Sequence, residues 1–340
     1  MVLNMQRISK HAVSVIGSGS WATAMVKMLA DNKLEKEVFW WVRKEEDVEY
    51  INRYRHNPTY LSAVEIKLHE DHVLSDVRQA IQSTDIVILN TPAAYLKIAL
   101  RGVENQDLEG KILVSAIKGI IPDENLIVGE YLNQTYGVPL DHIVVIGGPC
   151  HAEEVSQEKL SYLTFASKDL NKAQIVADLL SNRYINVNIS DDVLGVEYGA
   201  VLKNIYALAG GICHGLGYGD NFQAVLVSNA IREMEYFVQK IDPADREINA
   251  SVYLGDLLVT AYSQFSRNRT FGNMIGKGYT VQSAQLEMNM VAEGYYASGC
   301  IQSIIHKNNL EMPICNMVYE VLYNHRPAIF EVSKLAEKLT

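Results

Sequence analysis

Two isolated charges stand out among the residues that could do acid–base chemistry. Lys203 lies in the run Gly199-Ala-Val-Leu-Lys-Asn-Ile-Tyr206, and Asp256 lies in Leu254-Gly-Asp-Leu-Leu-Val259, so small or apolar residues surround each. Desolvation of a lysine buried in such a helix would favour its neutral form, which a general base near neutral pH requires. Taken alone, a lysine in such a helix more commonly extends from the core to water. Opposite charges in two apolar helices are best explained if they meet, so we predict an ion pair of Lys203 with Asp256.

A polar cluster, Ser266-Arg-Asn-Arg269, follows and interrupts the helical pattern of this half of the chain. Arg267 with Asn268 offers a forked set of donors that suits a phosphate oxyanion. A solvated helix end would look similar, so both interpretations stay open for this cluster. Asp220, which precedes another helical stretch, is interpreted as a helix N-cap rather than as a catalyst.

A glycine pattern near the start of the chain indicates a binding loop. Gly17-Ser-Gly-Ser-Trp-Ala22 fits G-x-G-x-x-G/A, directly after the β-branched run 11–16 and before helical spacing in residues 21–30. In that context Gly17 allows a tight turn, Gly19 lets the backbone approach a pyrophosphate, and the helix N-terminus presents free N–H groups. We predict that NAD or NADP binds here, against the alternative of a purely structural turn.

The second expected strand, residues 38–42, is followed by Arg43-Lys44 rather than by the Asp or Glu that commonly binds an adenosine ribose. A guanidinium at this place can stack on adenine and pair with a 2′-phosphate, so NADP is permitted as well as NAD. The alternative is that Arg43 and Lys44 only cap a solvated helix start.

The elements that must position these residues can be read from hydrophobic periodicity. Short apolar runs alternate with helical stretches, which predicts an α/β Rossmann-type domain with a doubly wound, mostly parallel sheet. The expected strands are residues 11–16, 38–42, 86–89, 112–115, 143–146, 162–166 and 184–189. Three polar or glycine-rich loops, Asn90-Thr-Pro92, Lys118-Gly119 and Gly147–Ala152, follow three of these strands. We expect them at the edge that carries the glycine loop, because ligands bind beyond the carboxyl ends of parallel strands.

After residue 190 the pattern becomes helical throughout. Helices are expected at residues 193–213, 222–240, 248–264, 280–298 and 313–324. We therefore predict two domains, a Rossmann-type domain of residues 1–190 and an all-α domain of residues 191–340.

Composition excludes several classes of protein and partner. With 48% hydrophobic and 21% charged residues, the chain is typical of globular proteins rather than disordered or fibrous ones. The net charge of −10, with neither half basic, makes nucleic acid or an anionic membrane a poor partner. The four cysteines lie far apart and lack metal-ligand spacing, so no metal site or disulfide is expected. Without a signal peptide or an apolar run long enough to span a membrane, a cytoplasmic location is expected.

Together these motifs resemble the bacterial-type NAD(P)-dependent glycerol-3-phosphate dehydrogenase family. The resemblance spans residues 10–300 and rests on motifs that occur in family order: Gly17–Ala24, Ser115–Gly119, Gly148–Val155, Leu202–Asn204, Gly255-Asp256, Ser266–Asn268 and Val291–Gly294. It implies a Rossmann-type domain followed by a helical domain. It also implies reversible hydride transfer between NAD(P) and dihydroxyacetone phosphate or sn-glycerol 3-phosphate, which supplies glycerol 3-phosphate for phospholipid synthesis. A homodimer is compatible with it.

The resemblance assigns roles residue by residue, with Lys203 as proton acceptor and Asp256 beside it. Cofactor contacts would come from Gly17, Ser18, Gly19, Ser20, Trp21, Arg43, Lys118, Ala152, Arg267, Val291 and Glu293. Substrate contacts would come from Lys118, Gly148, Cys150, Lys203, Asp256, Ser266, Arg267 and Asn268. The family usually has Ser or Thr where this chain has Cys150, and a thiol is a weak donor, so that contact would be weakened or lost.

Two other functions stay open on the sequence. A related two-domain dehydrogenase for a hydroxy acid or a polyol phosphate would accept a carboxylate substrate and not dihydroxyacetone phosphate. A non-catalytic dinucleotide-sensing protein would bind the cofactor without turnover. Such a sensor has no need for Lys203 and Asp256 in apolar helices.

Overall fold

The computed structural model describes residues 11–32, 34, 37–288 and 292–340, and the chain divides into two compact units. One unit contains the chain up to Ile117 together with Val128–Val193, and the other contains Lys118–Ile127 together with Leu194–Thr340. The segment Lys118–Ile127 lies inside the predicted first domain in sequence, but it packs with the helical unit.

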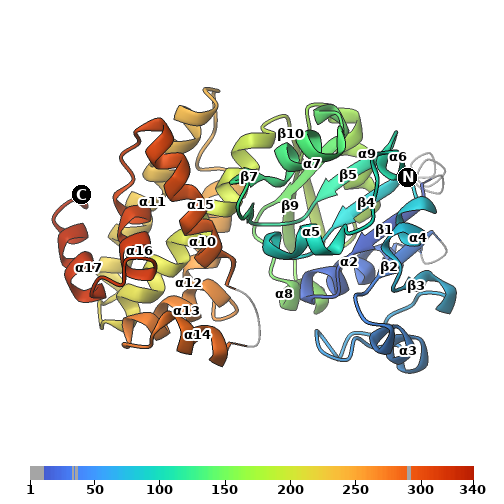
Figure 1. Cartoon of the computed structure of the whole chain (residues 1–340), viewed down its shortest axis with the longest axis horizontal. Helices are drawn as coiled ribbons and strands as arrows, with labels where there is room; N and C mark the ends of the chain where they lie inside the picture. The colour runs from blue at the N-terminus through green and yellow to red at the C-terminus, as the bar shows by residue number, and fades with distance from the viewer. Residues whose placement is uncertain (1–10, 33, 35–36, 289–291) are drawn as a thin grey trace. The chain divides into compact units, whose positions relative to one another are not determined.

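The first unit is built on an eight-stranded sheet (Figure 1) with the order β3-β2-β1-β4-β5-β8-β9-β10. Its strands are β1 (Val13–Ile16), β2 (Val38–Trp41), β3 (Val73–Leu74), β4 (Ile86–Leu89), β5 (Ile112–Ser115), β8 (Ile143–Gly147), β9 (Ser161–Ala166) and β10 (Ile185–Ser190). Neighbouring strands are parallel except β8 and β9, which are antiparallel. The predicted mostly parallel sheet is therefore confirmed.

Both faces of this sheet are covered, because all side chains of β1 are buried although they alternate between the faces. Val13 and Val15 share a core with residues of α2 and α9. The helices of this unit are α2 (Ser20–Asp31), α3 (Glu45–Tyr54), α4 (Val77–Gln82), α5 (Leu96–Ala99), α6 (Asn105–Leu108), α7 (Val128–Tyr136), α8 (Ala152–Ser156) and α9 (Leu170–Leu180). Ile16 is in register with Leu89, and Leu89 with Ser115, so β1, β4 and β5 end at one edge.

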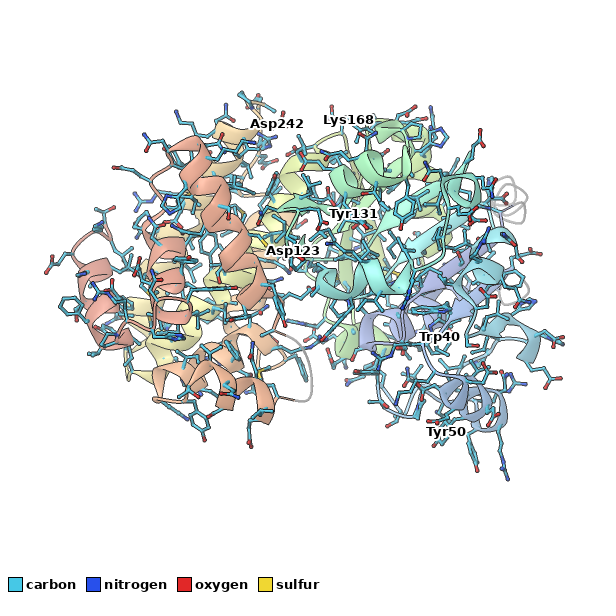
Figure 2. All side chains as sticks on the ribbon, viewed as in Figure 1. Trp40, Tyr50, Asp123, Tyr131, Lys168 and Asp242 are labelled. Atoms are coloured by element: carbon cyan, nitrogen blue, oxygen red, sulfur yellow. The ribbon has the colours of Figure 1, made fainter. Side chains whose placement is uncertain are left out.

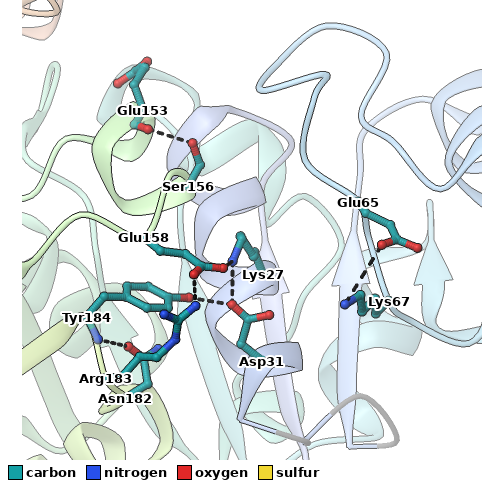
Figure 3. Close-up of polar contacts among 10 residues, drawn as sticks. All are labelled: Lys27, Asp31, Glu65, Lys67, Glu153, Ser156, Glu158, Asn182, Arg183 and Tyr184. Carbon is teal, nitrogen blue, oxygen red and sulfur yellow. Dashed lines mark hydrogen bonds and ion pairs between the residues drawn. The ribbon is translucent and has the colours of Figure 1, made fainter.

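Charged groups hold α2, the helix that follows the glycine loop, to distant parts of its unit. Lys27 Nζ lies 2.5 Å from Asp31 Oδ2 and 3.0 Å from Glu158 Oε1 (Figure 3). The Tyr184 hydroxyl donates to Asp31 Oδ2 at 2.7 Å. Burial, and then the hydrogen bond to Asp31, raises the pKa of this hydroxyl, so Tyr184 stays protonated and remains a donor. The network connects α2 to Glu158, which follows α8, and to Tyr184, which precedes β10.

The second unit is helical, as predicted. Its helices are α10 (Val193–Gly215), α11 (Asp220–Ile241), α12 (Asp256–Tyr262), α13 (Arg267–Gly276), α14 (Val281–Glu287), α15 (Glu293–Asn308), α16 (Pro313–Leu322) and α17 (Ala328–Ala336). An antiparallel hairpin of β6 (Ile120–Ile121) and β7 (Leu126–Ile127) completes it, and β6 packs on α15. In the described part of the chain, no helix combines the length and apolar character needed to cross a bilayer.

The helical pattern is interrupted before Arg267, as predicted: α12 ends at Tyr262 and α13 begins at Arg267, where the Ser266 hydroxyl accepts the Arg269 N–H at 3.3 Å. Two other local predictions for this unit are wrong. Asp220 is the first residue of α11 rather than its N-cap, which is Gly219 without a side-chain bond. The stretch 280–298 forms two helices, α14 and α15, because Met288 and Ala292 adopt extended backbone angles.

Glycines bring the backbone of α13 against that of α10, the helix that carries Lys203. A Cβ on Gly211 would overlap the carbonyl oxygen of Arg269, and one on Gly272 would overlap that of Leu208. Only glycine at these places permits this approach. The contact fixes α13, with its polar first turn, beside α10.

A buried carboxylate caps the start of α16. Glu233 on α11 accepts the N–H of Ile314 at 2.8 Å and that of Cys315 at 3.0 Å. These bonds satisfy two N–H groups at the helix start and lie at the positive end of its dipole. Burial nevertheless raises the pKa of Glu233 to about 7, although both N–H bonds act to lower it.

We expect Glu233 to make stability depend on pH. Its pKa in the folded chain, about 7, exceeds the ordinary value of 4.5, so the folded chain binds more protons between these values. The free energy of unfolding should therefore fall as pH rises from about 5 to 7, by ~2 kcal/mol from this group. Denaturant unfolding at pH 5 and pH 8 should show this slope in the wild type and in Glu235→Gln, an exposed control, but not in Glu233→Gln. Equal slopes in all three proteins would contradict the assignment.

Candidate active site

The glycine loop follows β1 at the carboxyl edge of the sheet. Gly17 has φ +143°, and a Cβ there would lie 2.6 Å from the carbonyl oxygen of Asn90, in the loop after β4. Glycine is therefore required both for the backbone angle and for the close approach of the two loops. Gly19 has φ −79°, and a Cβ there would meet no atom within 4 Å. No residue in the described part of the chain requires glycine at this second position.

The start of α2 and the loop beside it leave polar groups for a ligand. The N-cap of α2 is Gly19, without a side-chain hydrogen bond, so the first N–H groups of this 12-residue helix lack a side-chain cap. Several buried polar atoms nearby have no hydrogen-bond partner among the described residues: Trp21 Nε1, Asn90 Nδ2, Asn90 Oδ1 and Thr91 Oγ1. Buried polar atoms are normally paired, so these atoms fit a ligand rich in phosphate and hydroxyl groups.

Arg43 and Lys44 follow β2, and both are exposed. Lys44 is the N-cap residue of α3, but its side chain makes no capping bond. The first turn of α3 is acidic, with Glu45, Glu46 and Asp47, which suits the positive end of the helix dipole without help from either basic residue. The Arg43 guanidinium is thus not needed to start α3.

The loop after β8 is built around a second obligatory glycine. Gly148 has φ +108°, and a Cβ there would lie 2.5 Å from the carbonyl oxygen of Tyr162 on β9. The Cys150 thiol donates to the Gly148 carbonyl at 3.1 Å, so its hydrogen is used inside the loop. His151 is the N-cap residue of α8, and Ala152 is its buried first residue.

In the helical unit, Lys203 on α10 meets Asp256 on α12, which confirms the predicted ion pair. Lys203 Nζ donates to Asp256 Oδ1, and the two residues are 4% and 1% exposed. Lys203 Nζ also donates to Thr260 Oγ1 at 3.1 Å, and the Thr260 hydroxyl donates to the Asp256 carbonyl at 2.7 Å. Sequence reasoning missed Thr260, although its spacing of four residues from Asp256 places both on one helix face.

Two further features build this centre. Lys118 Nζ lies 3.6 Å from Asp256 Oδ2, and the Asn204 side-chain amide donates to the Lys118 carbonyl at 2.7 Å. A π-helical turn, Ser251–Gly255, comes directly before Asp256. Such turns often mark functional sites, because the extra residue redirects the side chains that follow. Lys118, at the start of the segment Lys118–Ile127, thus brings a second ammonium group to the Asp256 carboxylate, beside that of Lys203.

The first turn of α13 lies in the same unit. Ser266 caps α13, and Arg267 is its first residue. Asn268 Oδ1 accepts the Gly294 N–H at 2.9 Å, at the start of α15, while Glu293 is the first residue of that helix. The Asn268 oxygen is thus used within the fold, and its amide hydrogens are the part that could face a ligand. Val291, a predicted cofactor contact, lies outside the described residues.

Two ammonium groups share one buried carboxylate at this centre. Lys203 Nζ contacts Asp256 Oδ1, and Lys118 Nζ lies 3.6 Å from Asp256 Oδ2. With both lysines protonated, these three groups carry one net positive charge, which suits an anionic substrate. Among the described residues, no group of three or more His, Cys, Asp or Glu side chains could hold a metal ion.

A glycine loop at the carboxyl edge of a mostly parallel sheet, in a chain that also has a helical unit with a buried lysine–aspartate pair, is typical of nicotinamide-dinucleotide oxidoreductases. Residues 12–173 match the family described as NAD-dependent glycerol-3-phosphate dehydrogenase N-terminus, and residues 192–331 match the corresponding C-terminus. The chain therefore belongs to the NAD-dependent glycerol-3-phosphate dehydrogenase family. Its function is that of an NAD(P)-dependent glycerol-3-phosphate dehydrogenase.

Proteins with similar sequences or structures match nearly the whole length of this chain. The glycerol-3-phosphate dehydrogenase (NAD(P)+) of Chlorobium chlorochromatii is 33% identical over 93% of this chain and 94% of its own. That of Bacillus subtilis is 34% identical over 92% of this chain and 90% of its own. A crystal structure of glycerol-3-phosphate dehydrogenase from Coxiella burnetii has a TM-score of 0.89 at 25% identity, and covers 96% of this chain and 99% of that chain. A D-mandelate dehydrogenase complex with NADH reaches a TM-score of 0.57 at 17% identity, so it shares the fold alone.

Proposed function

We propose that Lys203 carries the proton in the glycerol-3-phosphate dehydrogenase reaction of this chain. The observation that supports this most is the contact of Lys203 with Asp256 and Thr260, with Lys118 on the other carboxylate oxygen. When bound, the dinucleotide accepts or gives a hydride at C4 of its nicotinamide. In oxidation, neutral Lys203 takes the proton of the C2 hydroxyl of sn-glycerol 3-phosphate. In reduction, its ammonium returns that proton to the carbonyl oxygen of dihydroxyacetone phosphate.

Asp256 and Thr260 position the amine rather than react themselves. Asp256 accepts one N–H of Lys203 and Thr260 accepts another, so two N–H groups of the amine are held by α12. Charge on the substrate oxygen in the transition state is stabilised by the Lys203 ammonium, whose own charge is balanced by Asp256. This arrangement keeps the amine in one orientation through the reaction.

The substrate phosphate would be held by the first turn of α13 and by Lys118. Arg267 offers a planar fork of donors, Asn268 retains its amide hydrogens, and Ser266 stands beside them at the N-cap. A phosphate held in this way places C2 for hydride transfer, which is where much of the rate advantage of an enzyme arises. The proposed substrate-binding residues are Lys118, Gly148, Cys150, Lys203, Asp256, Ser266, Arg267 and Asn268, with Cys150 contributing its place in the loop rather than its thiol hydrogen, which bonds to Gly148.

The dinucleotide would bind at the glycine loop, where buried polar atoms lack partners among the described residues. The proposed cofactor-binding residues are Gly17, Ser18, Gly19, Ser20, Trp21, Arg43, Lys118, Ala152, Arg267, Val291 and Glu293. The N-terminus of α2, which has no side-chain cap, would bind the pyrophosphate of the dinucleotide. The exposed guanidinium of Arg43 would bind its adenosine end.

The test is an absorbance assay with dihydroxyacetone phosphate and either NADH or NADPH in separate cuvettes. Oxidation of the reduced nicotinamide in either cuvette supports the proposal. Turnover of a 2-keto acid without turnover of dihydroxyacetone phosphate would favour the hydroxy-acid alternative. Cofactor binding in calorimetry with no turnover of any triose phosphate would favour the sensor.

We expect Arg43 to set the preference between the two dinucleotides. Because a guanidinium pairs with a 2′-phosphate, Arg43→Ala should raise the KM for NADPH by about tenfold and change that for NADH by less than about threefold. Lys67→Ala, an exposed lysine in the same unit, is the control. If Arg43→Ala raised the KM for NADH as much as that for NADPH, Arg43 would not bind the 2′-phosphate, and only stacking on the adenine would remain as its role.

Four further properties are proposals of the same kind. We propose that residues 1–190 serve dinucleotide binding and residues 191–340 serve substrate binding and catalysis, with Lys118–Ile127 contributed to the latter.

A cytoplasmic location is supported by four buried cysteines that are all free thiols. A role in supplying glycerol 3-phosphate for phospholipid synthesis, and assembly as a homodimer, rest on the family. Light scattering of the purified protein would test the dimer.

A further inference from the structure

Three consecutive carbonyl groups of the glycine loop are each held by a buried side chain from outside the loop. Trp40 Nε1 donates to the Gly17 carbonyl at 2.7 Å, Asn57 Nδ2 to the Ser18 carbonyl at 3.0 Å, and Thr23 Oγ1 to the Gly19 carbonyl at 3.0 Å. Trp40, on β2 (Figure 2), and Thr23, on α2, are fully buried. Asn57 is 2% exposed and lies in the chain after α3.

These bonds decide where the N–H groups of the loop point. In a trans peptide the carbonyl and the following N–H point in opposite directions. Holding the carbonyls of Gly17, Ser18 and Gly19 against the protein therefore turns the N–H groups of Ser18, Gly19 and Ser20 away from it. Within the described ranges, none of these three N–H groups has a hydrogen-bond acceptor. The result is a row of backbone donors in front of the N-terminus of α2, which is an anion-binding arrangement.

Asn57 is the member of this set with the most complete bonding. Its Oδ1 accepts the N–H groups of Thr59 and Tyr60, both at 2.9 Å, and its Nδ2 donates to Thr23 Oγ1 at 2.9 Å as well as to Ser18. Two N–H donors on one side and two acceptors on the other settle the orientation of the amide. Asn57 thus joins a tight turn to the glycine loop, and every polar position of its side chain is used.

We propose that Asn57 is a positioning residue for the dinucleotide, and that it preforms the row of N–H donors by holding the Ser18 carbonyl. This inference rests on the proposed binding of the dinucleotide at the glycine loop. A loop that is ordered before binding loses less conformational entropy when the pyrophosphate arrives, so affinity is higher. Without the Asn57 bond, the peptide between Ser18 and Gly19 can rotate, and the N–H array is lost in part of the population.

The substitution Asn57→Asp isolates the donor. The carboxylate retains an oxygen for Thr59 and Tyr60 but places an acceptor against the Ser18 carbonyl. Thr59→Asp is the matched control, because it adds the same charge two residues away, at an exposed position, and leaves Asn57 in place. Calorimetry should give a Kd for NADH about tenfold higher for Asn57→Asp than for Thr59→Asp. The kcat at saturating cofactor should agree within about twofold between the two variants.

A second variant and a second measurement do not depend on turnover. Thr23→Val removes the hydroxyl that holds the Gly19 carbonyl and conserves the side-chain shape, so its Kd for NADH should rise by about three- to tenfold. In the cofactor-free protein, amide hydrogen exchange at Gly17 and Thr23, whose N–H groups bond to Trp41 and Gly19, should be faster in Asn57→Asp than in the control.

The outcomes separate the two proposals. A Kd for Asn57→Asp within twofold of that for Thr59→Asp, with equal exchange rates, would overturn the role of Asn57 and leave the proposed function intact. Wild-type protein that binds neither NADH nor NADPH would overturn the binding site and this inference together. Faster exchange with an unchanged Kd would also overturn it, because the loop order would then not contribute to affinity.

Discussion

Replacement of Lys203 by alanine is expected to lower kcat by about 10²- to 10⁴-fold, because general acid–base groups contribute rate enhancements of this size. The dinucleotide contacts proposed for the glycine loop are untouched, so the Kd for NADH should stay within about threefold of the wild-type value. Steady-state kinetics with dihydroxyacetone phosphate and calorimetry with NADH give the two numbers. A variant that keeps more than about a tenth of the wild-type kcat would contradict the assignment of Lys203 as the proton carrier.

Two companion variants separate proton transfer from folding. Lys111→Ala removes another partly buried lysine, in the sheet unit, and should leave kcat near the wild-type value. Asp256→Asn retains the shape of the side chain but leaves Lys203 and Lys118 without their shared counter-charge. We expect a kcat loss for Asp256→Asn of about 10²-fold, with thermal unfolding showing whether the fold survives the loss of a buried partner.

The second large effect is expected at the glycine loop, where two glycines should respond differently. Gly19→Ala places a Cβ in open space at an ordinary backbone angle, so the free protein should unfold at the same temperature as the wild type. Its affinity for NADH should nevertheless fall by at least about tenfold, because that methyl group would occupy the space where a pyrophosphate approaches the backbone. Calorimetry and thermal unfolding check the two halves of this expectation.

Gly17→Ala should instead damage the fold itself. Gly17 has a φ of +143°, and the new Cβ would lie 2.6 Å from the carbonyl oxygen of Asn90. The free energy of unfolding should therefore drop by about 1–3 kcal/mol, and the affinity for the cofactor should also fall. Gly102→Ala is the control, since Gly102 has φ +86° with no atom near the added Cβ.

If Gly19→Ala bound NADH as tightly as the wild type, the dinucleotide would not lie against the glycine loop.

The findings favour glycerol-3-phosphate dehydrogenation over the two other functions that the sequence leaves open. Family membership over both halves of the chain supports glycerol-3-phosphate dehydrogenation directly. The hydroxy-acid dehydrogenases share the fold alone at low identity. A sensor without turnover has no physical use for a lysine that is 4% exposed and bonded to a carboxylate that is 1% exposed, since such a pair costs desolvation energy without need.

Sequence alone determined the parts of this protein that depend on local pattern. Runs of apolar residues between helical stretches predicted the parallel sheet, and the glycine pattern after the first strand predicted the loop at Gly17, because turn geometry depends on the residues in the turn. The meeting of Lys203 with Asp256 was predictable because a buried charge needs an opposite charge. Strands as short as β3, β6 and β7 were missed, since two residues show no alternation.

Tertiary structure decided which distant groups share a site. The second lysine at Asp256 comes from Lys118, 138 positions earlier, on a segment that belongs to the helical unit rather than to the sheet around it in sequence. Thr260 and Asn57 carry no motif, and only their contacts with Lys203 and Ser18 reveal them. Local pattern records the chemistry and backbone preference of neighbouring residues, whereas contacts between segments far apart depend on how the whole chain packs, so the sequence pattern does not contain them.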